Sequence, residues 1–299
     1  MIAQHIADGL LTGAIIAMGA IGVTLSMSIL RFANFAHSEL LTSGAYAALA
    51  LTGFFGLGAA PLGPLSVGWP FLGALAGAAA VTAALAIGLD GRVFGRMRRA
   101  GAARLSLIFA SFGLALVLRN FIVLLFGAAP DYYTRELQIA DEVWPGVRIM
   151  PDQVLVVGLT LVLVALLWLF LDRTRMGLAM RAVSENPVLA GVSGVDVAAV
   201  IRWTWALSGA LAGVAGVFLG LTVQLRPEMG FNLLLPLFAA AILGGSGSVG
   251  GAVVGGFIIG LAENLSVIWI SPGYKAAAPF FILLTVLAVR PRGLWGKKS

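Results

Sequence analysis

The stretch QVLVVGLTLVLVALLWLFL, residues 153–171, contains no Asp, Glu, Lys or Arg. It is long enough for a helix of about 20 residues, the length that crosses the hydrocarbon core of a membrane. Three further uncharged runs are longer, at 40–89, 203–225 and 229–262. Backbone groups in lipid must pair within a helix or a closed barrel, and these apolar runs are too continuous for barrel strands, which alternate. The sequence therefore predicts an all-α bundle of membrane helices.

The overall composition excludes a soluble globule. Of 299 residues, 60% are hydrophobic and 11% are charged, whereas a soluble domain carries roughly 25% charged residues. The net charge of +6 is explained by arginines in loops and needs no nucleic-acid partner. The chain has no cysteine, so disulfides and Cys-ligated metals are excluded. The N-terminus lacks the features of a cleaved signal peptide, and residues 1–299 are expected to form one transmembrane domain.

About eight membrane segments are expected, each of a length suited to the bilayer. They lie at 6–30, 36–57, 68–89, 105–127, 153–171, 202–224, 232–243 with 248–268 as a broken pair, and 276–290. Segment 232–243 is short and contains Pro236, and a glycine-rich turn follows it. These features favour a broken or re-entrant helix, with two full spans as the alternative.

Charge in the loops predicts the orientation, because Lys and Arg in short loops stay on the cytoplasmic side. Three groups hold 13 of the 19 basic residues: Arg92, Arg96, Arg98, Arg99 and Arg104; Arg173, Arg175, Arg181 and Arg202; and Arg290, Arg292, Lys297 and Lys298. Loop 128–152 instead holds the acids Asp131, Glu136, Asp141, Glu142 and Asp152 against Arg135 and Arg148. We expect this loop and the N-terminus outside and the C-terminus in the cytoplasm.

The basic stretch 172–201 is the longest internal connection. A connector between helices needs only a few residues, so a docking element is expected over 172–194. A surface helix over 176–185, ended by Pro187, is predicted within it. A solvated loop without a partner is the alternative.

A polar cluster follows the first apolar segment, at Arg31–Glu39. Polar side chains at membrane depth are costly unless they face protein or a water-filled path. On a helix, Asn34 and His37 would share a face, and we expect them to line or shape such a path. The alternative is that Arg31, His37 and Glu39 lie at the headgroups and cap helix ends. A His–Glu pair also allows metal binding or a proton relay, but without a third ligand the signal for either is weak.

A glycine-rich run, Gly244-Gly245-Ser246-Gly247-Ser248, interrupts the apolar stretch 229–262. It lacks the Lys-Ser or Lys-Thr of a phosphate loop. Glycines at four-residue spacing after it allow close helix packing. The break itself favours a discontinuous helix beside a transport path, with tight packing alone as the alternative.

The remaining intramembrane charges form no catalytic set. The histidines are His5 and His37 alone, which excludes triads and His-rich metal centres, so an enzyme is not expected. Arg119 interrupts segment 105–127 and needs a partner or water. The alternative function from another class is a carrier or channel driven by an ion gradient. Glu39 or Glu263 would then titrate in the transport cycle. The docking-like loop over 172–194 disfavours this alternative.

Four motifs, taken in order, resemble one known family. They are Asn34-Phe-Ala-His37-Ser-Glu39 with Gly44-Ala-Tyr46, Arg175-Met-Gly177-Leu-Ala-Met-Arg181-Ala182 with Asn186 and Ala190, Ala241-Ile-Leu-Gly-Gly-Ser-Gly-Ser248 with Gly250-Gly251, and Tyr274-Lys275 with Val289-Arg290-Pro291-Arg292-Gly293-Leu294. Together they resemble the LIV-type permeases of branched-chain amino acid ABC importers. Ser38 departs from the family's usual Gly, which puts the pore shape at that point in doubt.

The resemblance implies a type II-like importer half in the bacterial cytoplasmic membrane. Its partners would be a homologous permease subunit, two cytoplasmic ATPases that bind ATP and Mg²⁺, and a periplasmic solute-binding protein; the chain itself would carry no cofactor. The cargo would be branched-chain amino acids, with urea, amides or small carboxylates as alternatives. The implied path residues are Asn34, Phe35, His37, Ser38, Glu39, Gly244, Gly245, Ser246, Gly247 and Ser248. The implied ATPase-coupling residues are Arg175, Gly177, Arg181, Ala182, Glu185 and Asn186.

Overall fold

The computed structural model describes residues 2–54, 64–133, 140–245, 247–290 and 293–296. Several residues singled out above lie outside these ranges: Ser246, Arg135, Glu136, Arg292, Lys297 and Lys298.

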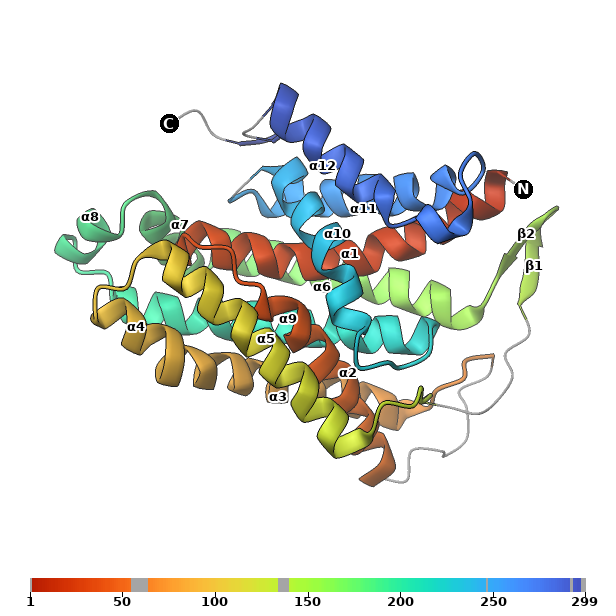
Figure 1. Ribbon diagram of the computed structural model, residues 1–299, viewed down its shortest axis with the longest axis horizontal. Coiled ribbons are helices and arrows are strands. Elements are labelled where there is room, and N and C mark those ends of the chain that lie inside the picture. Colours follow the sequence, from red (N-terminus) through yellow and green to blue (C-terminus); the bar gives the residue numbers. More distant parts are fainter. Residues whose placement is uncertain (1, 55–63, 134–139, 246, 291–292, 297–299) are drawn as a thin grey trace.

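The described chain is mainly helical, and its long helices run along a common axis (Figure 1). The helices are α1 (Ile2–Leu30), α2 (Ala36–Phe54), α3 (Trp69–Leu89), α4 (Gly95–Arg99), α5 (Arg104–Phe126), α6 (Pro151–Arg173), α7 (Arg175–Glu185), α8 (Pro187–Val192), α9 (Val197–Thr222), α10 (Met229–Gly244), α11 (Val249–Ser266) and α12 (Ala277–Val289). The π-helix η1 (Asp90–Phe94) joins α3 to α4, and the 3₁₀-helix η2 (Pro272–Tyr274) precedes α12. Strands β1 (Asp141–Trp144) and β2 (Val147–Ile149) form an antiparallel hairpin.

The predicted membrane bundle is confirmed. Among the described residues, six helical stretches are long and apolar enough to cross a membrane: α1, α3 continued through α4, α5, α6, α9 and α11. Helices α10 and α12 are apolar but shorter. Helices α4, α7 and α8 gather at one end of the bundle, and the N-terminus and the β-hairpin lie at the other (Figure 1). We call these the arm end and the hairpin end.

The predicted break in the late apolar stretch is also observed. Helix α10 ends at Gly244, and α11 starts at Val249, where the Ser248 hydroxyl accepts a hydrogen bond from the Gly251 amide at 3.0 Å. With 16 residues, α10 is about 24 Å long at 1.5 Å per residue. It is therefore shorter than the ~30 Å hydrocarbon core, and it lies obliquely to its neighbours in Figure 1.

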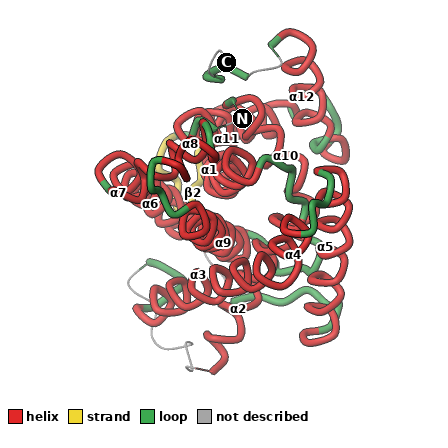
Figure 2. Tube along the Cα trace, turned by 90° about the vertical axis from the view of Figure 1, so that its left-hand side faces the viewer, coloured by secondary structure: helices red, strands yellow, loops and turns green. Residues whose placement is uncertain are grey.

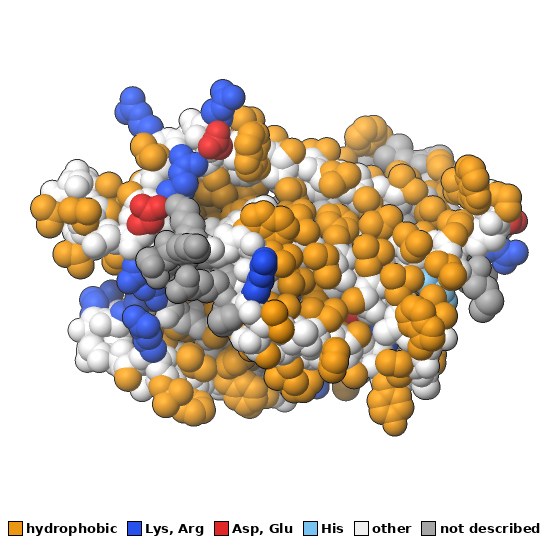
Figure 3. Space-filling view, turned by 90° about the horizontal axis from the view of Figure 1, so that it is seen from above, with side chains coloured by type: hydrophobic (Ala, Val, Ile, Leu, Met, Phe, Trp, Pro, Cys, Tyr) orange, Lys and Arg blue, Asp and Glu red, His pale blue; other side chains and the backbone are white. Residues whose placement is uncertain are grey.

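Helices α1 and α9 form the interior of the bundle. Within their most apolar windows, 89% of α1 and 72% of α9 are buried, against 17% of α6. Seen end-on (Figure 2), α5 and α12 lie at one edge. Apolar side chains cover most of the face seen in Figure 3, and several basic side chains gather toward one end of it. A continuous apolar surface of this kind fits lipid or another membrane subunit.

The stretch 172–194 contains one helix more than the sequence predicted. Helix α7 matches the expected helix over 176–185, but Pro187 does not simply end it. Asn186 caps a second short helix, α8, by accepting hydrogen bonds from the Val188 and Leu189 amides at 3.0 Å, and Pro187 takes its first position. Proline suits that position because its missing N–H would have no helical partner there.

Candidate functional site

The Asn34 turn lies immediately before α2 and is not helical, so the helical face expected to be shared by Asn34 and His37 does not form. The Asn34 side-chain oxygen accepts from the Ala36 amide at 3.2 Å, and its backbone oxygen accepts from the His37 amide at 3.2 Å. Asn34 thus acts as a turn residue that starts the helix, as short polar side chains commonly do.

His37 faces the interior of the bundle. Its Nε2 lies 3.1 Å from the backbone oxygen of Gly19 on α1, and a Cβ on Gly22 would meet its ring. The Ser38 hydroxyl donates to the Phe35 backbone oxygen at 3.1 Å. Both side chains are buried, and in the structure they shape the position of α2.

Phe35 connects three helices at the start of α2. Its ring lies 5.4 Å from that of Phe238 on α10 and 6.2 Å from that of Phe112 on α5, edge to face with the latter. The Phe35 amide donates to the Ser111 hydroxyl at 3.0 Å. An aromatic cluster therefore occupies the space between α5 and α10 at this depth.

A charged layer follows one turn further along α2. Glu39 is buried, and its Oε2 has no hydrogen-bond partner among the described residues. The Arg119 guanidinium on α5 interacts electrostatically with it, and lies 5.6 Å from the centre of the Phe231 ring on α10. Arg119, whose partner the sequence left open, thus belongs to a layer shared by α2, α5 and α10. A cation over an aromatic face is stabilised by the ring quadrupole.

A third layer lies nearer the hairpin end. Tyr46 on α2 packs on Phe126 of α5 with ring centres 4.9 Å apart. Beside it, the Tyr133 hydroxyl donates to the Ala45 backbone oxygen at 2.8 Å. Burial raises the pKa of the Tyr133 phenol well above its ordinary value, so the group stays protonated and able to donate.

These three layers share one face of α5. Phe112, Arg119 and Phe126 are seven residues apart, which places them along one side of a helix. We use the name layered groove for the contact that Phe35, Glu39 and Tyr46 make with these three residues and with α10. Sequence reasoning singled out Phe35, Glu39, Tyr46 and Arg119; the seven-residue spacing on α5 was the signal that could have found Phe112 and Phe126.

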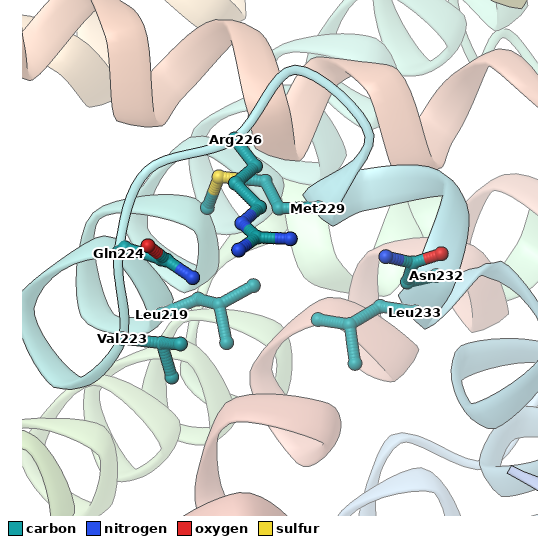
Figure 4. A pocket seen from close by; sticks show the side chains of 7 residues that line it. All are labelled: Leu219, Val223, Gln224, Arg226, Met229, Asn232 and Leu233. Carbon is teal, nitrogen blue, oxygen red and sulfur yellow. The ribbon is translucent and has the colours of Figure 1, made fainter. Parts of the chain in front are cut away.

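A pocket of about 300 Å³ opens at the hairpin end, between α9 and α10 (Figure 4). Leu219, Val223, Met229 and Leu233 give it apolar walls, and Gln224, Arg226 and Asn232 supply its polar groups. In the orientation of the Gln224 amide that satisfies both its ends, its oxygen accepts from Arg226 Nε at 2.9 Å. A backbone pairing of Asp131 with Leu225 ties this loop to the segment after α5.

The glycine break lies under the C-terminal tail. The Leu294 and Trp295 amides donate to the backbone oxygens of Leu243 and Gly244 at 2.8 and 3.2 Å. Gly245 has a φ of 99°, a left-handed conformation that favours glycine. Gly247 lies beside Ser28 of α1. The described break therefore contacts the tail and α1, while Phe35 meets α10 at Phe238, one to two turns earlier.

The predicted coupling residues all lie on α7 or where it joins α8, in an arm at one end of the bundle (Figure 1). A Cβ on Gly177 would overlap the backbone of Leu171, so α7 folds tightly against the end of α6. Arg181 forms an ion pair with Asp172 at 3.2 Å. Arg175 is exposed and Ala182 half-buried. We call α7 and α8 together the arm, and α7 is thus packed onto the end of α6.

Arg31 connects the arm to the start of α2. Its guanidinium donates to the backbone oxygens of Ser184 and Glu185 at 3.3 and 3.1 Å, at the C-terminal end of α7, where a cation is favoured by the helix dipole. Arg31 itself has a left-handed φ of 60°. For a non-glycine residue this conformation is uncommon and persists where the surroundings hold it.

Exposed apolar side chains mark the outer surface of the arm. They are Leu178 (61% exposed), Val188 (75%), Leu189 (63%) and Val192 (83%). Such a patch beyond the membrane helices is typical of a protein interface. Within the described residues, no group of three or more His, Asp or Glu side chains could hold a metal ion.

Comparison with known proteins agrees with this architecture. The family model of the branched-chain amino acid transport system permease component matches residues 5–288. The chain belongs to this family. It is therefore a transport permease and a multi-pass membrane protein, and the resemblance read from its motifs is confirmed.

Two relatives match this permease over nearly its whole length. The high-affinity branched-chain amino acid transport system permease protein LivH of Escherichia coli is 30% identical over 98% of this chain and 95% of its own. The corresponding protein BraD of Pseudomonas aeruginosa is 31% identical over the same shares. A chain of PsaBC from Streptococcus pneumoniae, solved in complex with Fab, aligns over 97% of this chain and 92% of its own with a TM-score of 0.49 and 14% identity.

Proposed function

We propose that this permease is the membrane-spanning subunit of an ATP-driven ABC importer that moves branched-chain amino acids or similar small solutes into the bacterial cytoplasm. Its partners are a homologous permease subunit, two cytoplasmic ATPases that bind ATP and Mg²⁺, and a periplasmic binding protein. The arm end and the C-terminus face the cytoplasm, and the hairpin end and the N-terminus face outward. The positive-inside rule supports this orientation, because Arg96, Arg98, Arg99 and Arg181 lie at the arm end.

The observation that carries the proposal is the apolar patch on the arm. Leu189 and Val192 lie on α8, outside the membrane helices, and remain largely exposed. Exposing apolar side chains to water is unfavourable at about 25 cal/mol per Å², so a separate soluble partner is expected to cover them. An ATPase subunit is that partner.

The layered groove lies, in this proposal, on the side of the permease that faces the transport path. Solute passes between this groove and the homologous subunit, and the Phe35 cluster closes the passage on the arm side of the charged layer. Arg31 links the arm to the turn that carries Phe35. A movement of α7 on ATP binding is therefore transmitted to the aromatic cluster through the Arg31 side chain and the short segment 32–34 that precedes Phe35.

The test is uptake of labelled leucine by proteoliposomes that contain the permease with the partner subunits from neighbouring reading frames. Uptake is expected only with ATP and the binding protein. The double variant Leu189→Ser/Val192→Ser should lower uptake at least about tenfold, because an interface core contact is worth more than about 1.4 kcal/mol. The control is Val143→Ser, which changes an exposed apolar residue at the hairpin end.

Two results would contradict the proposal. Concentrative uptake by this chain alone, without nucleotide, would indicate a carrier driven by an ion gradient. Unchanged uptake and unchanged ATPase binding in the double variant would remove the docking role of the arm.

A further inference from the structure

A second cavity, of about 500 Å³, lies at the arm end between the π-helix with α4 and the first turns of α9. Its lining residues are Asp90, Gly91, Gly95, Arg98, Arg99, Ala198, Ile201 and Arg202. Neither the transport path nor the arm uses this cavity. We propose that it binds the phosphate headgroup of an anionic phospholipid.

The cavity carries an excess of positive charge. Arg98 pairs with Asp90 at 2.6 Å, which accounts for one of its three guanidinium groups. Arg99 forms no ion pair with any described acid. Arg202 lies 3.8 Å from Asp196, and both of these side chains are largely exposed; such pairs contribute little. The lining therefore has an excess of two positive charges over Asp90.

Two of the three guanidinium groups, those of Arg98 and Arg99, lie close together beside Gly95. A Cβ built on Gly95 would lie 3.5 Å from Arg99 Nη1 and 3.7 Å from Arg98 Nη2. The buried Nη1 of Arg98 has no hydrogen-bond partner among the described residues, so a donor remains for a ligand. Planar guanidinium groups match phosphate oxygens in pairs of hydrogen bonds, and a π-helical turn such as Asp90–Phe94 often marks a functional site.

The position of the cavity distinguishes a lipid headgroup from other phosphates. It lies at one end of two membrane-spanning stretches, between the last residues of the stretch that ends at Arg99 and the start of α9 at Val197. Ile201 continues its wall toward the membrane, and the exposed Trp203 follows on the same helix. Tryptophan is enriched at membrane interfaces, and basic pockets between membrane helices on the cytoplasmic side bind anionic headgroups. A lipid can place its phosphate among the arginines and its chains along this wall.

The test is native mass spectrometry of the importer complex in detergent, titrated with short-chain phosphatidylglycerol, with phosphatidylcholine, or with inorganic phosphate. The variant is Arg99→Gln/Arg202→Gln, which leaves the Arg98–Asp90 pair intact. Its charge-matched control, Arg173→Gln/Arg290→Gln, removes two exposed arginines from the same end outside the cavity. A unimodal melting transition for each variant verifies folding.

We expect one tightly bound phosphatidylglycerol and no comparable binding of phosphatidylcholine. The cavity variant should bind phosphatidylglycerol about tenfold more weakly, consistent with the contribution of each basic residue near a membrane surface, and the control should match wild type. Equal losses in both variants would show general charge attraction and overturn the proposal. Binding of inorganic phosphate without preference for phosphatidylglycerol would identify a free-anion site, and loss of an ATPase subunit from the cavity variant alone would identify a protein contact; either result would overturn the lipid assignment.

Discussion

The interface between α1 and α11 and the layered groove between α5 and α10 differ in how closely the backbones approach. On the first side, a Cβ on Gly256 would lie 2.5 Å from the backbone of Ala17, and one on Gly260 would overlap the backbone of Gly13. On the second side, a Cβ on Gly113 of α5 would meet no described atom within 4 Å. Large side chains instead span the space between α5 and its neighbours, although on α10 a Cβ on Gly230 would overlap the Ser38 backbone oxygen. Backbone-to-backbone packing leaves little freedom to slide, whereas side-chain layers can rearrange. Helix α10 also packs by its backbone, since a Cβ on Gly255 of α11 would overlap the Ala240 backbone oxygen. We infer that α1, α10 and α11 form the fixed scaffold and that α5 moves.

Adding one methyl group should therefore have very different consequences on the two sides. Gly260→Ala is expected to destabilise the permease by at least about 2 kcal/mol, because the new Cβ forces two helices apart. Gly113→Ala should change stability by less than about 0.5 kcal/mol. The measurement is the fraction of monodisperse protein after heating in detergent. Equal stability of the two variants would contradict the division into scaffold and moving side.

The scaffold was predictable from sequence to a larger extent than the groove. The uncharged runs predicted the membrane helices, and the four-residue glycine spacing after Ser248 predicted their close packing, because both signals are local. The partner of Arg119 could not be predicted, since it depends on which residues of α2 and α10 meet α5 in space. Helix α8 was missed because Pro187 ends one helix or begins another, and only the cap made by Asn186 distinguishes the two.

The charged layer of Glu39 and Arg119 offers a sharper test of whether the layered groove acts in transport. Arg119→Gln removes the positive charge near buried Glu39 and should lower ATP-driven uptake about tenfold, because the loss of this charge changes the electrostatic potential that a solute meets at the layer. The double variant Glu39→Gln/Arg119→Gln removes both charges and should recover part of the loss, so the two effects should not add. The control is Asn120→Ala, whose exposed side chain bonds to its own helix at the Leu116 oxygen.

If Arg119 and Glu39 served stability alone, thermal resistance and uptake would fall together in the single variant and recover together in the double. A role in the path predicts instead that uptake falls while the melting behaviour stays near that of wild type. Additive losses of uptake in the double variant would show that the two side chains do not act as a unit.

The pocket beside Arg226 should give the smallest effect, because it opens at the hairpin end between α9 and α10 and none of its lining residues belongs to the layered groove. The Arg226 guanidinium already interacts with two side chains: it donates to the Gln224 amide oxygen, and it lies 3.8 Å from the Glu228 carboxylate. A charge in such an open position mainly steers association and contributes little to binding energy. We expect Arg226→Gln to raise the apparent KM for loaded binding protein about two- to fivefold with little change in kcat. Arg148→Gln, at an exposed position on the hairpin, is the matched control.

The difference in apparent KM between Arg226→Gln and wild type should shrink as the salt concentration rises, because screening removes electrostatic steering from wild type as well. A loss of kcat that persists at high salt would instead place Arg226 among the groups that act during solute passage. The moving part of the permease would then extend from α5 to the outer end of α10.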